Sequence, residues 1–129
     1  MIIYAETDEI WTFNEINNIS NKLAHYFLSQ GFQKGDTIAI FMENDPKYMI
    51  VLLALAKIGV TAALINNHLR HEALMHSINI AKCRGIVYQF GLEEALIPIS
   101  SNLIAPRGKS PFQLFCIQNG FRVRHLLLL

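Results

Sequence analysis

The sequence predicts an α/β fold in which a parallel sheet is covered by helices on both faces, as part of a three-layer arrangement. Two observations support this prediction. The central unit, residues 36–66, has the pattern strand, helix, strand. On either side of it, short apolar runs alternate with longer segments that have a helical period. Because two buried strands joined by a helix run parallel, the helices are expected to lie on the faces of one sheet.

The first elements are expected to be a hairpin and a long helix. Residues 2–5 and 10–12 fit a small antiparallel hairpin. Thr12 and Glu15 fit a capping box, in which each side chain satisfies a backbone donor at the start of a helix. Apolar residues then recur at helical spacing up to Gly31, where the helix is expected to end.

The central unit contains two apolar runs and the helix between them. Thr37–Met42 is typical of a strand buried on both faces. Asp45 and Pro46 fit the N-cap and first turn of a helix that ends at Gly59, a residue that tolerates a left-handed cap. Val60–Ile65 is then expected to form a second buried strand, parallel to the first.

A membrane span is the alternative interpretation of this helix, because residues 48–56 are apolar throughout. A span needs about 20 apolar residues. Lys57 interrupts the run at about half that length. A helix buried between the sheet and its neighbours is therefore the better interpretation.

The remaining sequence divides at about residue 96. Residues 70–82 are expected to form a helix, 85–88 a strand and 93–96 a helical turn. All ten acidic residues lie at or before Glu94, whereas the segment after it contains four basic residues and no acidic one. We therefore expect an α/β unit over residues 1–96 and a divergent, poorly ordered basic tail over residues 97–129.

Composition excludes several functional classes. The N-terminus has no basic region of the kind that opens a secretory signal. Cys83 and Cys116 are far apart and match neither a disulfide framework nor a zinc motif, which fits a reducing compartment. Basic residues are not interleaved with aromatic ones on one face, so no nucleic acid partner is expected.

The histidines near residue 70 form the strongest candidate metal cluster. They are His68, His71 and His76, with Glu72 among them. A zinc protease helix needs two histidines four residues apart, whereas His71 and His76 are five apart. At about 100° per residue, that step turns the two rings away from one another. We therefore expect no metal site here.

No other motif indicates catalysis. The sequence contains neither a Gly-x-Ser-x-Gly elbow nor a Gly-x-x-x-x-Gly-Lys phosphate loop. Glu93 and Glu94 are adjacent, so on a helix they diverge and cannot flank one bond. From the residues alone, no catalytic, cofactor-binding or metal-binding residue is predicted.

Six segments nevertheless resemble the beginning of the AMP-forming acyl-CoA synthetase superfamily. They are Trp11–Glu15, Lys34–Asp36, Phe41–Asn44, Leu55–Val60, Ala63–Asn66 and Leu69–Arg70. The Lys-Gly-Asp turn and the Lys-Ile-Gly-Val segment are general to the superfamily. The Met-Glu-Asn, Ala-Leu-Ile-Asn and Leu-Arg segments are more specific to the fatty acid transport protein branch, also called very long-chain acyl-CoA synthetases. The resemblance covers residues 2–96, and His68 departs from the asparagine usual in the branch.

The resemblance implies an N-terminal fragment of a fatty acid–CoA ligase that uses ATP, coenzyme A and magnesium. It implies a long-chain or very long-chain fatty acid as substrate, and membrane association at the endoplasmic reticulum or plasma membrane. The branch's Ser/Thr/Gly-rich phosphate loop has no match in this sequence. The chain alone is therefore expected to be inactive and cytoplasmic. The alternative is a non-enzymatic interaction module that docks on a full-length synthetase or on a membrane surface through its basic tail.

Overall fold

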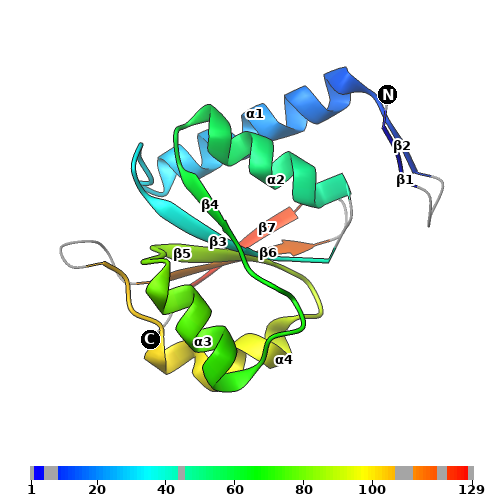
Figure 1. Ribbon diagram of the computed structural model, residues 1–129. Coiled ribbons are helices and arrows are strands. Elements are labelled where there is room, and N and C mark those ends of the chain that lie inside the picture. The colour runs from blue at the N-terminus through cyan, green and yellow to red at the C-terminus, as the bar shows by residue number, and fades with distance from the viewer. Residues whose placement is uncertain (1, 5–8, 44–45, 107–111, 119–121, 128–129) are drawn as a thin grey trace.

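A five-stranded sheet forms the centre of the computed structural model, which describes residues 2–4, 9–43, 46–106, 112–118 and 122–127 (Figure 1). The strand order is β4-β3-β5-β6-β7. The first four strands in this order are parallel, and β7 is antiparallel to β6. The bounds are β3 (Thr37–Phe41), β4 (Thr61–Leu64), β5 (Gly85–Gln89), β6 (Gln113–Gln118) and β7 (Arg122–Leu127).

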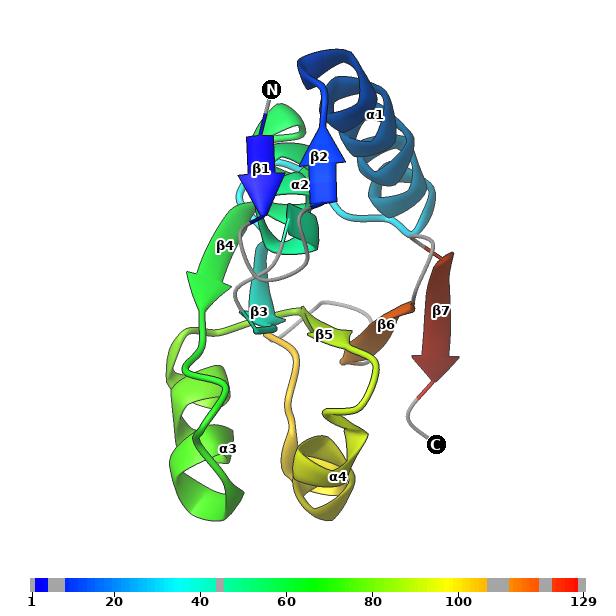
Figure 2. The ribbon, with the colours of Figure 1, turned by 90° about the vertical axis from the view of Figure 1, so that its right-hand side faces the viewer.

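Helices cover both faces of this sheet, so the predicted three-layer α/β arrangement is confirmed. Figures 1 and 2 show α1 (Phe13–Ser29) and α2 (Pro46–Lys57) together on one face. On the other face lie α3 (His71–Ile80), α4 (Glu93–Leu96) and the 3₁₀ helix η1 (Ile97–Asn102). Each face has its own apolar cluster, and β3 and β5 contribute side chains to both.

The predicted N-terminal hairpin, the long helix and the Thr12 half of its capping box are also confirmed. Strands β1 (Ile2–Tyr4) and β2 (Glu9–Trp11) pair antiparallel, and their connecting turn lies outside the described residues. At the start of α1 the backbone N–H of Glu15 donates to Thr12 Oγ1 at 3.1 Å, as a capping threonine requires. Gly31 follows the helix with a φ of +92°, a conformation that glycine adopts without a steric cost.

The crossover helix α2 is a buried helix of the domain. It begins at Pro46, and its predicted cap, Asp45, lies outside the described residues. One side of the helix packs on the sheet, with Ile50, Val51 and Ala54 fully buried. In the described part of the chain, no helix combines the length and the apolar character that crossing a bilayer requires.

The prediction that residues 60–65 form a second buried strand is wrong about the burial. Strand β4 is parallel to β3 as expected, but it is the edge strand of the sheet. Thr61 and Leu64 are exposed, Leu64 by 60%. An apolar run specifies a strand, but its place in the sheet depends on how the other strands pair. Strand β3 occupies the position between two neighbours instead, and its residues 38–41 are buried.

The expectation of a poorly ordered segment over residues 97–129 also differs from the structure. The described part of this segment contains η1, β6 and β7. Strand β6 pairs with β5 over five residue pairs, and Phe115 is fully buried with its ring centroid 5.2 Å from that of Phe27. Residues 112–117 have the length of a strand and are apolar except for Gln113. Nearby prolines and glycines mask its periodicity in the sequence.

A buried ion pair joins the turn before β3 to the start of β5. Arg84 Nη1 lies 2.8 Å from Asp36 Oδ2, and the two side chains are 7% and 5% exposed. Asp36 Oδ2 also accepts from the backbone N–H of Gln33 at 2.9 Å. Arg84 Nη1 donates to the Gly31 carbonyl at 2.6 Å, and the guanidinium lies 4.6 Å from the centroid of the Phe32 ring. The pair therefore fixes the end of α1 to the central strands.

We predict that Arg84→Met lowers the free energy of unfolding by about 3–5 kcal/mol, because it leaves the Asp36 carboxylate buried without its partner. The double variant Asp36→Asn with Arg84→Met removes both charges, so it should be more stable than Arg84→Met alone. Urea denaturation of the four proteins in the cycle measures this. A double variant whose loss equals the sum of the two single losses would contradict the account.

Candidate ligand site at the carboxyl edge of the sheet

The carboxyl edge of the parallel strands is where this architecture places binding sites. Helix α2 joins β3 to β4 across one face, and α3 joins β4 to β5 across the other. Strands β4 and β5 lie on opposite sides of β3. The direction in which successive strands are added to the sheet therefore changes at β3. In open α/β sheets, ligands bind outside the carboxyl ends of the strands at such a point. Here the Gln89 side chain spans the ends of β5 and β3, accepting from the Glu43 N–H at 2.9 Å.

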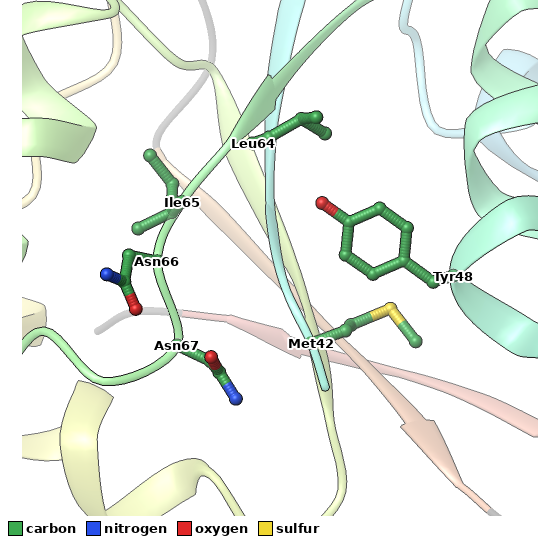
Figure 3. A pocket seen from close by; sticks show the side chains of 6 residues that line it. All are labelled: Met42, Tyr48, Leu64, Ile65, Asn66 and Asn67. Atoms are coloured by element: carbon green, nitrogen blue, oxygen red, sulfur yellow. The ribbon is translucent and has the colours of Figure 1, made fainter. Parts of the chain in front are cut away.

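A pocket of about 500 Å³ lies at this edge, beside the ends of β3 and β4 (Figure 3). It is lined by Met42, Tyr48, Leu64, Ile65, Asn66 and Asn67. Met42 follows β3, Tyr48 belongs to the first turns of α2, and the other four continue from the last residue of β4. In Figure 3 the Tyr48 hydroxyl points across the pocket toward the segment of Leu64 and Ile65. Most of this described lining is apolar, since the Met42, Leu64 and Ile65 side chains and the Tyr48 ring contribute to it.

Two neutral polar groups in the pocket have free hydrogen-bonding capacity. Within the described part of the chain, neither the Tyr48 hydroxyl nor the Asn67 side-chain amide has a hydrogen-bond partner. Burial raises the pKa of Tyr48, so its hydroxyl stays protonated at neutral pH and can donate. Asn66 differs, because its Oδ1 accepts from the backbone N–H of His68 at 2.9 Å. Its side chain shapes the turn.

Arg70 holds the loop that forms one wall of the pocket. Its Nη1 donates to the carbonyls of Asn67 and Leu69 at 2.6 and 2.7 Å. Its Nη2 lies 3.1 Å from Glu94 Oε1, and its guanidinium lies 5.8 Å from the centroid of the Phe41 ring. The following residue, His71, has a φ of +55°, which is uncommon for residues other than glycine. The backbone of Asn67 is therefore fixed before any ligand arrives.

The candidate residues weighed from the sequence do not form a site together. His68 lies in the loop before α3, His71 begins the helix, and His76 lies in its second half. Among the residues that the structure describes, no group of three or more His, Cys, Asp or Glu side chains is placed to hold a metal ion. Glu93 and Glu94 diverge as expected. Glu94 pairs with Arg70, while Glu93 accepts from the backbone of Gly91.

Both cysteines lie in the core. Cys83 is fully buried, and burial raises the pKa of its thiol to about 11. A thiol with that pKa remains protonated at neutral pH and is a poor nucleophile. Cys116 is 3% exposed, and its Sγ lies 3.6 Å from Glu93 Oε1. The described structure therefore gives these side chains a packing role.

Sequence reasoning missed the pocket, although it singled out two of its segments for their resemblance to a family. Residues 42–43 and 65–67 each follow a strand directly. Since parallel strands end at the same edge, two apolar runs followed by polar residues could have indicated a shared site. Tyr48 carries no such signal, because its orientation depends on how α2 packs on the sheet.

Comparison with known proteins points to one family. A family model described as "AMP-binding enzyme" matches residues 1–115. Long-chain fatty acid transport protein 1 of Rattus norvegicus is 35% identical over 115 residues, which is 89% of this chain and 17% of the relative. Medium/long-chain-fatty-acid–CoA ligase FadD6 of Mycobacterium tuberculosis is 28% identical over 89 residues, covering 69% of this chain and 15% of the ligase. The chain thus spans about a sixth of these relatives.

Solved structures show the same fold. The long-chain-fatty-acid-CoA ligase FadD1 from Archaeoglobus fulgidus superposes with a TM-score of 0.74 at 23% identity, covering 82% of this chain and 20% of that one. A Mycobacterium tuberculosis fatty acyl CoA synthetase gives a TM-score of 0.72 at 21% identity, covering 84% and 22%. The family match continues past residue 96 and includes the first three residues of β6.

Because the pKa of Cys83 is raised in the folded chain, the free energy of unfolding is expected to depend on pH in the alkaline range. Between about pH 9 and 11 the unfolded chain loses a proton that the folded chain keeps, so the free energy of unfolding falls as pH rises. We expect Cys83→Ala to remove this contribution. The stability difference between wild type and variant should therefore be constant below pH 8 and shrink toward pH 10.5. Urea denaturation at several pH values tests this, and a difference that stays constant throughout would refute it.

Proposed function

Because the chain belongs to the family of AMP-binding enzymes, we propose that it forms the N-terminal part of a ligase that activates long-chain fatty acids. The observation that carries this proposal is the 35% identity over 115 residues to a long-chain fatty acid transport protein. In the proposed reaction the fatty acid carboxylate reacts with ATP to form acyl-AMP and pyrophosphate. The acyl group then passes to the thiol of coenzyme A, and AMP is released. Uptake would be driven by trapping the fatty acid as its thioester, at a membrane of the cell.

In this proposal the described residues contribute the scaffold of the large domain. Strands β3, β5 and β6 are buried and parallel, so their carboxyl ends form a rigid edge for other parts of the ligase. The six described residues that line the pocket are uncharged, so they offer no charged group to the phosphates of ATP or to magnesium. The guanidinium of Arg70 is already engaged by two carbonyls and Glu94. Phosphoryl chemistry needs charges placed at the phosphates, so we assign no such step to these residues.

The first prediction concerns the chain by itself. Purified chain incubated with ATP, magnesium, coenzyme A and radiolabelled palmitate should form no labelled acyl-CoA above a heat-treated control. The reason is that no described side chain is placed to stabilise charge on a transferring phosphate. Turnover above the control would overturn the expectation that this chain is inactive alone.

The second prediction concerns the chain inside a whole ligase. A chimera of rat long-chain fatty acid transport protein 1, with residues 1–115 of this chain replacing the matched segment, should keep measurable ATP- and CoA-dependent acylation. A matched chimera with Ile38→Asp should lose it, since Ile38 is fully buried in β3. A first chimera that folds and yet has no activity would contradict the assignment to this family activity.

A second candidate function is a non-enzymatic module that docks on a full-length synthetase or on a membrane. The open edge of β4 favours it, because the strand sequence Thr-Ala-Ala-Leu lacks the charges and prolines that usually protect an edge. Co-sedimentation with liposomes containing phosphatidylserine tests the membrane version. Binding that weakens in Arg122→Gln with Arg124→Gln would support it, and equal sedimentation of both proteins would exclude a role for these charges.

A further inference from the structure

We propose that the amino edge of the sheet, where β3, β4 and β5 begin, is a docking surface for an acidic polypeptide segment of another protein. This goes beyond the proposed function, which assigns no partner to this edge. The surface consists of residues 33–36 before β3, 57–60 before β4 and 81–84 before β5. Each of these three turns carries one exposed lysine, namely Lys34, Lys57 and Lys82.

Strand pairing sets the three turns side by side. Strand β3 lies between β4 and β5. Neighbouring strands are about 4.8 Å apart, so the beginnings of the three strands span about 10 Å. Contacts between the turns agree with this, because the Gly35 N–H donates to the Gly59 carbonyl at 3.2 Å and Arg84 meets Asp36 at 2.8 Å. Figure 1 shows α1, α2 and α3 ending on this same side of the sheet.

Acidic side chains do not balance the charge of these lysines. The only acidic residue of the three turns is Asp36, and Arg84 already neutralises it in the buried ion pair. In the described part of the chain, none of the three lysine ammonium groups has an ion-pair partner. The carbonyl ends of the helices supply about half a negative charge each, which offsets only part of the total. Positive charge therefore remains at this edge, and it favours an acidic partner.

The lysine side chains are partly ordered before a partner binds. Lys57 Nζ donates to Asn17 Oδ1 at 2.7 Å and to Asn21 Oδ1 at 2.5 Å. Both acceptors are neutral, so the ammonium keeps its charge, and it has a third N–H to donate. Lys34 packs on the neighbouring turn, since its Cγ lies 3.0 Å from where a Cβ on Gly59 would be. Such ordering reduces the entropy that is lost on binding.

The surroundings of the lysines favour a polypeptide over a membrane. None of the large hydrophobic side chains that are exposed in the described structure belongs to the three turns. A face that binds a membrane usually combines basic side chains with apolar ones, which enter the lipid layer. In an extended peptide, side chains on the same side are about 7 Å apart, so successive carboxylates reach neighbouring turns.

Hexaglutamate and hexaglutamine, both with blocked termini, test this proposal because they differ in charge. The full chain, labelled with ¹⁵N, is titrated with each peptide at pH 7.5 and low salt, where charged contacts are least screened, and followed by two-dimensional NMR. We expect saturable shifts in the three turns with hexaglutamate and none with hexaglutamine. An absence of saturable shifts with hexaglutamate, or equal shifts with hexaglutamine, would overturn the proposal.

Two triple variants, each lacking three positive charges, locate the surface. The amino-edge variant combines Lys34→Gln, Lys57→Gln and Lys82→Gln, and the control variant combines Lys47→Gln, Arg122→Gln and Arg124→Gln. The control residues lie toward the carboxyl edge, in the first turn of α2 and beside the second half of β6. The amino-edge variant should raise the hexaglutamate dissociation constant at least about tenfold, and the control variant less than about threefold. Equal effects of the two variants would refute the location.

A competition experiment decides between the two classes of partner. Phosphatidylserine vesicles, added at the same concentration of accessible negative charge as hexaglutamate, should leave the peptide-induced shifts unchanged. Vesicles that displace hexaglutamate would assign the edge to a membrane and overturn the proposal. None of these measurements depends on the activity of the chimera, so the proposed function is tested separately.

Discussion

The arrangement of the sheet depends on one buried ion pair at its amino edge. Asp36 and Arg84 are 48 residues apart in the sequence, and their side chains meet at 2.8 Å with almost no access to water. The cost of burying these charges is offset only when both are present and hydrogen-bonded. The backbone reinforces the same contact, because the N–H of Arg84 donates to the Thr37 carbonyl at 2.7 Å. The pair thus joins the start of β5 to the turn before β3.

This constraint accounts for what the sequence could and could not predict. Local signals located the elements: the Thr12 cap, the glycines after α1 and α2, and the apolar run of β3 all act within a few residues. The order of the strands is not local. Val60–Ile65 and Thr37–Met42 have similar compositions, yet one forms the edge and the other an inner strand. The difference lies in long-range pairing, because β3 pairs with both β4 and β5, and no periodicity reveals this.

The pocket was predictable only in part, because tertiary contacts bring its residues together. Its residues come from the ends of β3 and β4 and from α2, and none belongs to a catalytic motif. A Tyr side chain on an apolar helix indicates core packing when the helix is considered alone. Its role changes because α2 packs on β3 with its first turn beside the end of β4. The resemblance to a ligase family, in contrast, was visible in short motifs, since those report shared ancestry and do not depend on tertiary contacts.

Strand β7 has a consequence for any larger assembly. It lies beyond the part of the chain that the family model matches, and it pairs with β6 through six residue pairs. The hydrogen-bonding edge of β6 is therefore already occupied by the chain's own C-terminal hairpin. A strand from another molecule could pair with this edge of β6 only after displacing β7. Strand exchange at that edge is consequently a competition, in which the tethered strand has the advantage of a high local concentration.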